Sequence, residues 1–336
     1  MESRDQLSHL APPAAVAEHA EPLGAEALSE NHTSRLLPYV LITPARNEEA
    51  FIEKTLESMV QQTHLPLKWV IVSDGSTDRT AEIVEKYARQ CSWIELVCRP
   101  PRKERNFAGK VQAFNEGFDR VQDLRFTLIG NLDADISFAP DHFEFLAGKF
   151  SEDAMLGVAG TAYTQDGWDS MADSFEGQAS VHGACQLFRR ECFLDIGGYC
   201  ANPAGGIDWI AVTTARMKGW KTRNYPQRRF HHYRTMGTAE RSPLGAMFDY
   251  GKKDYFLGGS PLWELFRVAY RMTKQPVVLG GLSLLFGYCW SAIQRTERPV
   301  SRELIRFHRH EQMEKLRFIL RTLIKQRRLE KYLPAE

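Results

Sequence analysis

The sequence predicts an α/β protein built on a mostly parallel, doubly wound sheet. From Pro38 to Leu132, short apolar runs alternate with segments whose apolar residues recur at helical spacing. This alternation is typical of strand–helix–strand units, whose strands pair in parallel. The chain has 336 residues, of which 43% are hydrophobic and 25% charged. This is enough to bury a large core, and the composition is that of an ordinary soluble protein.

Each element is expected from its own pattern, because apolar runs predict strands and apolar residues three or four apart predict helices. In the first part we expect strands at 39–42, 69–72, 94–98 and 128–132, and helices at 51–62, 80–90 and 110–121. Beyond residue 150 we expect strands at 156–163 and 184–188, a charged turn at 189–191, a helix at 207–218, and extended segments at 221–225 and 229–233. From about Pro243 the chain is expected to be mostly helical.

Three regions follow from these patterns. Residues 1–37 are rich in Ala, Glu, His and Pro without a sustained apolar period, which predicts a disordered tail. Residues 38–240 form the expected α/β domain, and residues 241–336 a helical extension. Within the extension, 275–294 carries no charge, and 295–328 holds eleven Lys and Arg against four Glu, a net charge of +7. We expect 275–294 to span a membrane, to lie on one, or to be an ordinary buried helix. The basic tail favours contact with an anionic surface.

Charge and cysteine content exclude several classes of protein. A net charge of +1 argues against a dedicated nucleic-acid binder. The six cysteines are scattered without metal-finger spacing, which is typical of small core residues in a reducing compartment. The N-terminus has no basic segment followed by an apolar run, so we expect no secretory signal and a cytoplasmic location, at the inner face of the cell membrane.

The most informative segment is the end of the strand expected at 128–132. Asp133 and Asp135 follow it, and side chains two residues apart on an extended segment point to the same side. Open α/β sheets bind their ligands at this edge. Paired carboxylates suit a hard divalent cation and, through it, a phosphate.

Two other strand ends carry candidate donor-binding groups. Thr43, Pro44 and Ala45 end the first strand, where they can meet a planar base, and Glu48 can accept hydrogen bonds from hydroxyls. The alternative for Glu48 is an acidic residue favoured at a helix N-terminus. Asp74 ends the second strand and can accept the N3–H of uracil, or else serve only as a turn residue.

Later segments supply the remaining charged groups. Lys110 follows Gly109 at an expected helix start, which suits a diphosphate. Asp208 follows a glycine pair and is either a helix cap or a general base for an acceptor hydroxyl. Either His232 or His231 can complete a metal shell, since adjacent residues of a strand face opposite sides, and Arg234 can meet phosphate.

The order of these motifs resembles the family-two glycosyltransferases with a GT-A fold. The resemblance rests on Pro-x-Arg-Asn-Glu (44–48), Ser-Asp-Gly-Ser-Thr-Asp (73–78), Gly-Lys-x-x-Ala-x-Asn (109–115), Asp-Ala-Asp (133–135), Gly-Gly-Ile-Asp-Trp (205–209) and His-His-Tyr-Arg (231–234). It covers about residues 38–240. The extension resembles a bacterial subgroup linked to surface polysaccharide assembly.

The resemblance implies roles for the matching residues. It places Asp74 at the base, Asp133 near the donor ribose or sugar, Asp135 on Mn²⁺ or Mg²⁺, and Asp208 as the base of an inverting transfer. Many relatives carry Glu-Asp where this chain has Ile207-Asp208, so a contact from the first carboxylate is absent. We expect an inverting transferase that uses a nucleoside-diphosphate sugar, with UDP as the expected nucleotide, and a saccharide or lipid-linked acceptor.

Two other functions remain open at this point. A sugar-phosphate nucleotidyltransferase would use a similar sheet and metal, but it would carry a Gly-rich basic loop after the first strand, which 44–49 lacks. A catalytically inactive nucleotide-sugar-binding protein would not need Asp133, Asp135 and Asp208 together.

Overall fold

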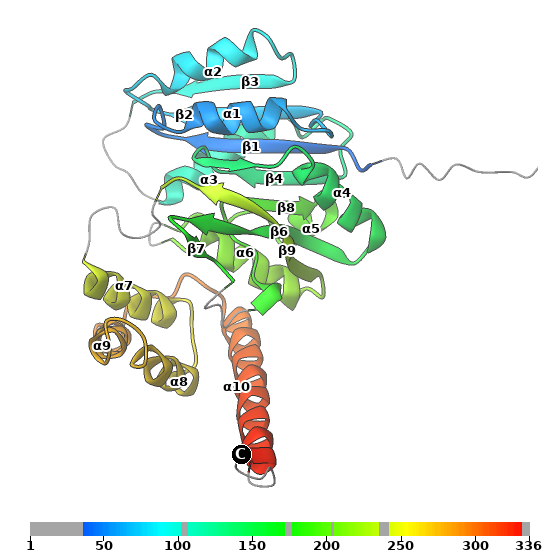
Figure 1. Cartoon of the computed structure of the whole chain (residues 1–336). Helices are drawn as coiled ribbons and strands as arrows, with labels where there is room; N and C mark the ends of the chain where they lie inside the picture. The colour runs from blue at the N-terminus through cyan, green and yellow to red at the C-terminus, as the bar shows by residue number, and fades with distance from the viewer. Residues whose placement is uncertain (1–35, 102–106, 172–176, 203–204, 235–241, 331–336) are drawn as a thin grey trace, which may run out of the picture. The chain divides into compact units, whose positions relative to one another are not determined.

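The computed structural model describes residues 36–101, 107–171, 177–202, 205–234 and 242–330. The expected tail at 1–37 lies outside these residues except for Leu36 and Leu37, which pack against the core. The first elements in chain order are β1 (Tyr39–Ala45), α1 (Ile52–Val60), β2 (Lys68–Asp74), α2 (Thr80–Ala88), β3 (Ile94–Arg99), α3 (Phe107–Asp119) and β4 (Leu128–Leu132). The alternation expected from the sequence is therefore confirmed in this part (Figure 1).

The second part holds shorter elements. They are β5 (Ile136–Phe138), α4 (His142–Glu152), β6 (Leu156–Gln165), β7 (Trp168–Asp169), the 3-10 turn η1 (Gly177–Ala179), β8 (Cys185–Arg189), α5 (Arg190–Asp195), α6 (Ile207–Met217) and β9 (Lys221–His232). The expected turn at 189–191 is wrong, because Arg190 begins helix α5, which buries Cys192 and Phe193. The two extended segments expected at 221–225 and 229–233 are one strand, β9, with an irregularity where it pairs β6.

The central sheet has the strand order β3-β2-β1-β4-β8-β6-β9-β5, with β7 paired to β6. Strands β3, β2, β1 and β4 are parallel neighbours, as the crossover helices between them require. Beyond β4 the sheet is mixed, since β8 runs antiparallel to both β4 and β6, whereas β9 is parallel to β6. The chain direction therefore changes next to β4, beside the strand end that carries Asp133.

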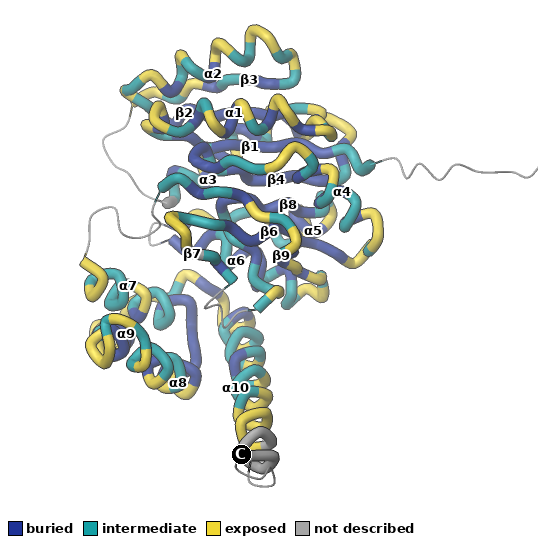
Figure 2. Tube along the Cα trace, in the orientation of Figure 1, coloured by how far each residue is buried: buried dark blue, intermediate teal, exposed yellow. Residues whose placement is uncertain are grey.

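Helices cover both faces of the sheet. On one face, α1, α2 and α4 pack on side chains such as Tyr39 and Leu41 of β1. On the other, α3, α5 and α6 pack on the alternate residues Val40 and Ile42. Strands buried on both faces need continuous apolar runs, and β1 and β2 are accordingly dark along nearly their whole length in Figure 2, with only Pro44 and Lys68 half-buried.

Four helices follow the sheet: α7 (Pro243–Phe256), α8 (Pro261–Arg271), α9 (Leu279–Ile293) and α10 (Arg302–Glu330). Helix α7 begins at a capped turn, where Ser242 Oγ accepts from the amide of Gly245 and Pro243 occupies the first turn. Arg216 on α6 donates to Glu311 on α10 over 2.7 and 3.0 Å. The helical extension is confirmed, while its division from the sheet at residue 240 remains a prediction.

The uncharged segment 275–294 forms mainly α9. None of the helices in the described ranges has both the length and the apolar character that crossing a membrane requires. On one side α9 buries Gly281, Leu284, Gly287 and Tyr288.

Candidate active site

The two carboxylates expected to act together lie between β4 and β5. The amide of Asp133 donates to the carbonyl of Ala184 over 2.8 Å, which fixes the turn against the chain next to β8. Asp135 is only 7% exposed. Burial, followed by the negative charge of Asp133, raises the pKa of Asp135, while His232 and Arg234 oppose the rise. A cation bound between Asp133 and Asp135 would relieve the repulsion between these two carboxylates.

Of the two histidines, the structure places His232 with these carboxylates. One ligand atom from each of Asp133, Asp135 and His232 lies within 4.8 Å of the others, and His232 Nε2 is 3.7 Å from Asp135 Oδ1. His231 lies on the other side of β9, where its ring packs against Tyr233 at 4.5 Å. The buried Nδ1 atom of His232 has no hydrogen-bond partner in the described part of the chain. Two carboxylates and such an imidazole fit a divalent cation with mixed oxygen and nitrogen ligands.

Two basic residues lie against these carboxylates. Lys110, in the first turn of α3, donates to Asp133 Oδ1 over 2.5 Å. Burial lowers the pKa of Lys110, but the adjacent Asp133 outweighs burial, so the pKa is raised. Arg234 donates to Glu48, and its Nε atom lies 3.7 Å from Asp135 Oδ2. Positive charge is thus concentrated beside these carboxylates.

The ends of β1 and β2 are neighbours, because Ala45 pairs with Ser73. Thr43 points inward and accepts a hydrogen bond from Trp69 Nε1 over 2.9 Å, so its hydroxyl is engaged within the protein. The side chain of Ala45 also lies in the core, and Pro44 is half-buried. At this strand end, therefore, a ligand would meet backbone rather than the Thr43 and Ala45 side chains.

Asp74 is buried and paired. It accepts from Arg99 over 2.6 Å, and Arg99 also lies 3.0 Å from Glu116. Gly75 after it has a positive φ of 67°, which a tight turn away from the strand requires. The base contact expected for Asp74 remains a prediction.

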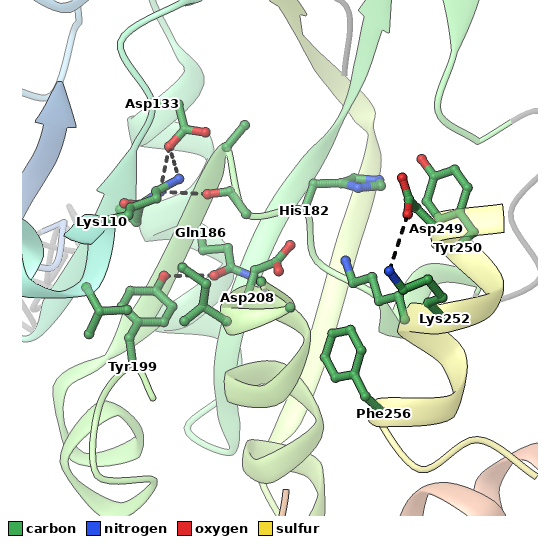
Figure 3. Close-up of a pocket in the computed structure, with 18 of the residues that line it drawn as sticks. Lys110, Asp133, His182, Gln186, Tyr199, Asp208, Asp249, Tyr250, Lys252 and Phe256 are labelled. Carbon is green, nitrogen blue, oxygen red and sulfur yellow. Dashed lines mark hydrogen bonds and ion pairs between the residues drawn. The ribbon is translucent and has the colours of Figure 1, made fainter. Parts of the chain in front are cut away.

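A cavity of about 800 Å³ opens between the sheet edge and helix α7. Figure 3 shows Lys110, Asp133, Gln186, Tyr199 and Asp208 on one side, and Asp249, Tyr250, Lys252 and Phe256 on the other. Ser291 and Thr296, from α9 and the segment after it, also line it. A cavity of this size accommodates a small-molecule ligand. Three predicted site residues that lie far apart in the sequence therefore line the same cavity: Lys110, Asp133 and Asp208.

Asp208 reaches this space because of two glycines. It lies in the first turn of α6, two residues after Gly206, whose φ of 78° is favoured by glycine. A Cβ on Gly183 would lie 2.8 Å from Asp208 Oδ2, so only glycine admits the carboxylate there. The carbonyl of Gly183 accepts from Asn131 over 2.6 Å, and Asn131 also donates to Asp133 over 3.1 Å. Gly183 therefore lies next to Asp208 and is linked through Asn131 to Asp133.

Sequence reasoning missed several polar residues of this site. Asn131 interrupts an apolar strand two residues before Asp133, a signal that could have identified it. Tyr199 donates to Gln186 over 2.8 Å, and both line the cavity. Burial, followed by the charge of Asp208, raises the pKa of Tyr199 well above its usual value, so it stays a hydrogen-bond donor. The sequence did not indicate that residues of α7, among them Tyr250 and Phe256, form the opposite wall.

Comparison with known proteins shows which proteins part of the chain resembles. Residues 40–174 match the family model described as Glycosyl transferase family 2. The chain is 29% identical over 135 residues to "Uncharacterized glycosyltransferase EpsJ" of Bacillus subtilis, covering 40% of this chain and 36% of the relative. It is 33% identical over 116 residues to "4,4'-diaponeurosporenoate glycosyltransferase" of Staphylococcus aureus, covering 34% and 28%. The matches thus span only about a third of each relative.

A solved structure confirms the fold. GalNAc-T7, crystallised with UDP, GalNAc and Mn²⁺, superposes with a TM-score of 0.54 at 14% identity, covering 86% of this chain and 58% of that one. This likeness concerns the arrangement of the chain, which is that of the expected GT-A fold.

Proposed function

We propose that the chain is a family-two glycosyltransferase, in line with the relatives it matches. In this proposal it transfers a sugar from a nucleoside-diphosphate sugar, with UDP as the nucleotide, to a saccharide or lipid-linked saccharide, with inversion at the anomeric carbon. The observation that carries this proposal is the convergence of Asp133, Lys110 and Asp208 on one cavity. The proposed role is in the assembly of a cell-surface or exopolysaccharide.

Three residues would hold a divalent cation, Mn²⁺ or Mg²⁺, in this proposal: Asp135, Asp133 and His232. When bound, such a cation stabilises the negative charge of the departing diphosphate. The raised pKa of Asp135 supports a metal here, because a buried carboxylate beside a second one is stabilised by a cation. Lys110 and Arg234, already in contact with these carboxylates, would supply further positive charge to the diphosphate.

Asp208 is the proposed general base. The acceptor oxygen forms a bond to the anomeric carbon, its proton passes to the Asp208 carboxylate, and the bond from the anomeric carbon to the diphosphate oxygen breaks with its electron pair. Gly183 and Gly206 leave room for the carboxylate at the cavity, which supports this role. Direct displacement requires the base and the leaving group on opposite sides of the sugar.

The nucleoside is proposed to bind where β1 and β2 end. Asp74 accepts the N3–H of uracil while it keeps its ion pair with Arg99. Backbone groups of 43–45 contact the base, and Glu48, held by Arg234, contacts ribose hydroxyls. Two oxygens on each carboxylate allow both contacts at once.

The substitution Asp208→Asn tests the base. We expect transfer to fall at least 100-fold, since general-base catalysis contributes about 10²–10⁴-fold, while the Kd for UDP measured by calorimetry changes less than twofold. The control Asp123→Asn, at an exposed position, keeps normal activity. Full turnover by Asp208→Asn would rule out the assignment. If the unmodified protein binds UDP-sugars yet neither transfers nor hydrolyses any, the chain is an inactive binding protein.

We further propose that helix α9 rests on the inner face of the cell membrane. Its exposed side carries a stripe of large apolar side chains at helical spacing: Leu279, Leu282, Phe286, Trp290 and Ile293, the last 77% exposed. Figure 2 shows this exposed surface in yellow. Residues 265–296 hold four cationic residues and no acidic one, namely Arg267, Arg271, Lys274 and Arg295. An apolar stripe with a basic surround matches an anionic lipid surface.

Vesicle sedimentation tests this contact. We expect the protein to bind vesicles of phosphatidylcholine with 30% phosphatidylglycerol and to bind pure phosphatidylcholine weakly. Replacing Phe286 and Ile293 by Asp should abolish sedimentation, whereas Leu194→Asp, at a position on α5 about as exposed as Phe286, should not. Concentration-dependent dimers that disappear in the Phe286/Ile293 variant, without vesicle binding, would show that a second copy covers the stripe instead.

A further inference from the structure

A second cavity adjoins the candidate active site. It has a volume of about 290 Å³ and lies among α6, α7, α8 and α10. Tyr250 and Lys253 of α7 line both cavities, so the two spaces meet at these side chains. A ligand with its reacting end at Asp208 and a length of more than one sugar ring would enter the second cavity next.

The second cavity is positively charged. Four cationic and two acidic side chains line it, a net charge of +2 with His308 neutral: Arg216, Lys253, Arg267, Lys315, Asp254 and Glu311. The ion pairs of Arg216 with Glu311 and of Arg267 with Asp254 balance two of the cations. Lys253, at the junction with the first cavity, contributes to the excess charge.

Lys253 lies at the junction, close to the proposed base. A Cβ built on Gly206 would be 3.5 Å from its Cε atom, so the lysine stem packs on the residue two positions before Asp208. Within the described ranges, no acidic group lies within ion-pair distance of its ammonium. A half-buried lysine without a counter-ion in a cavity offers a binding position for an anionic group.

The rest of the lining suits a sugar. Trp209 and Trp263 contribute indole rings, and the Trp209 ring is held by an edge contact with His308 at 4.5 Å. Trp209 directly follows Asp208 on α6, so the aromatic surface begins next to the proposed base. Aromatic rings with one apolar face and one polar edge pack on the C–H faces of sugars while their N–H groups meet hydroxyls.

We propose that the second cavity is an acceptor subsite for a saccharide unit that bears an anionic group, either a carboxylate or a phosphate, which Lys253 binds. The subsite rests on the proposed transferase function, since it orients the acceptor hydroxyl toward Asp208. It makes the acceptor an anionic oligosaccharide of at least two units. Lys253 is then a specificity-determining residue, with no contact to the reacting atoms.

Binding of three matched disaccharides tests the proposal. Cellobiose, cellobiouronic acid and cellobiose 6′-phosphate are titrated by calorimetry against the full chain with UDP and Mn²⁺ present. We expect a charged probe to bind about tenfold tighter than cellobiose, since a hydrogen bond to a charged group is stronger than one between neutral groups. Tighter binding of the uronate alone or of the phosphate alone supports the subsite and identifies the anion. Equal binding of all three, or of none, overturns it.

Two substitutions assign the effect to the subsite. Lys253→Met should remove the preference for the charged probe, and Lys253→Arg should retain it. The matched control Lys218→Met, at a surface position on the C-terminal end of α6, should leave the preference unchanged. A preference that survives Lys253→Met in a folded variant overturns the assignment.

Hydrolysis of UDP-sugars by the unmodified protein is measured in parallel. If hydrolysis occurs without a charge preference among the probes, the subsite alone fails. If no UDP-sugar is bound or hydrolysed, the proposed function fails as well.

Discussion

Helices α7 and α9 approach each other so closely that two glycines are required. A Cβ on Gly251 would overlap the carbonyl oxygen of Leu284 and lie 2.8 Å from the amide nitrogen of Tyr288. A Cβ on Gly287 would overlap the carbonyl of Phe248 in the same way. Because both obstacles are backbone atoms, no rotamer change relieves them, and the helices must separate. The perturbation we consider is Gly251→Ala.

The expected loss of stability follows from two opposing effects. Inserting a methyl group into a packed interface costs about 1–3 kcal/mol, and contact with backbone puts Gly251→Ala at the upper end. Alanine gains about 1 kcal/mol over glycine inside a helix. The free energy of unfolding should therefore fall by about 2 kcal/mol. At about 2–4 °C per kcal/mol, the Tm falls by about 4–8 °C.

Thermal unfolding followed by circular dichroism checks this value. The control is Gly148→Ala in α4, where a Cβ would meet nothing within 4 Å, so only the helix preference acts and the Tm should rise slightly. Since α7 forms one wall of the active-site cavity, Gly251→Ala should also raise the KM for the acceptor more than the KM for the donor. An unchanged Tm for Gly251→Ala would refute the inferred helix contact.

Three further predictions concern buried ionisable groups. Burial lowers the pKa of His142 to about 4, so stability is lost as pH falls from about 6.5 toward 4, by about 3 kcal/mol in total, and His142→Gln should flatten this part of the Tm–pH curve. Burial, followed by the charge of Asp254, raises the pKa of Glu264 to about 8. Stability is therefore lost as pH rises from about 4.5 to 8, and Glu264→Gln should have the higher Tm at pH 8.5 but not at pH 5. Finally, 1 mM Mn²⁺ with UDP should raise the Tm, and removal of the Mn²⁺ by a chelator should reverse the rise. The variant Asp135→Asn should show no such rise. A rise in Asp135→Asn equal to that of the unmodified protein would exclude Asp135 as a metal ligand.

Residues near one another in sequence were predicted well. Apolar runs bounded by turns predicted β1, β2, β3 and β4, because a strand that is buried on both faces has a continuous apolar sequence. The position of Asp133 at the end of β4 follows from the apolar run at 128–132 alone. Helix α5 was missed because Arg190 and Glu191 suggest a turn, whereas Cys192 and Phe193 supply its buried side. Whether these six residues form a helix or a turn depends on how Cys192 and Phe193 pack in the core, which a segment of this length does not show.

Contacts between distant residues were decided only by the tertiary structure. The sequence does not distinguish the two adjacent histidines as metal ligands. The pairing of β9 with β5 places His232, and not His231, next to Asp135. The ion pair of Lys110 with Asp133 likewise joins separate elements. The sequence does not show that α7 forms a wall of the cavity, since the position of α7 depends on the glycine contacts with α9. The sequence by itself thus determined the strands and the candidate acidic groups, through local periodicity. The cavity, its charge and the choice of His232 as the candidate metal ligand depend on side-chain distances that only the packed chain sets.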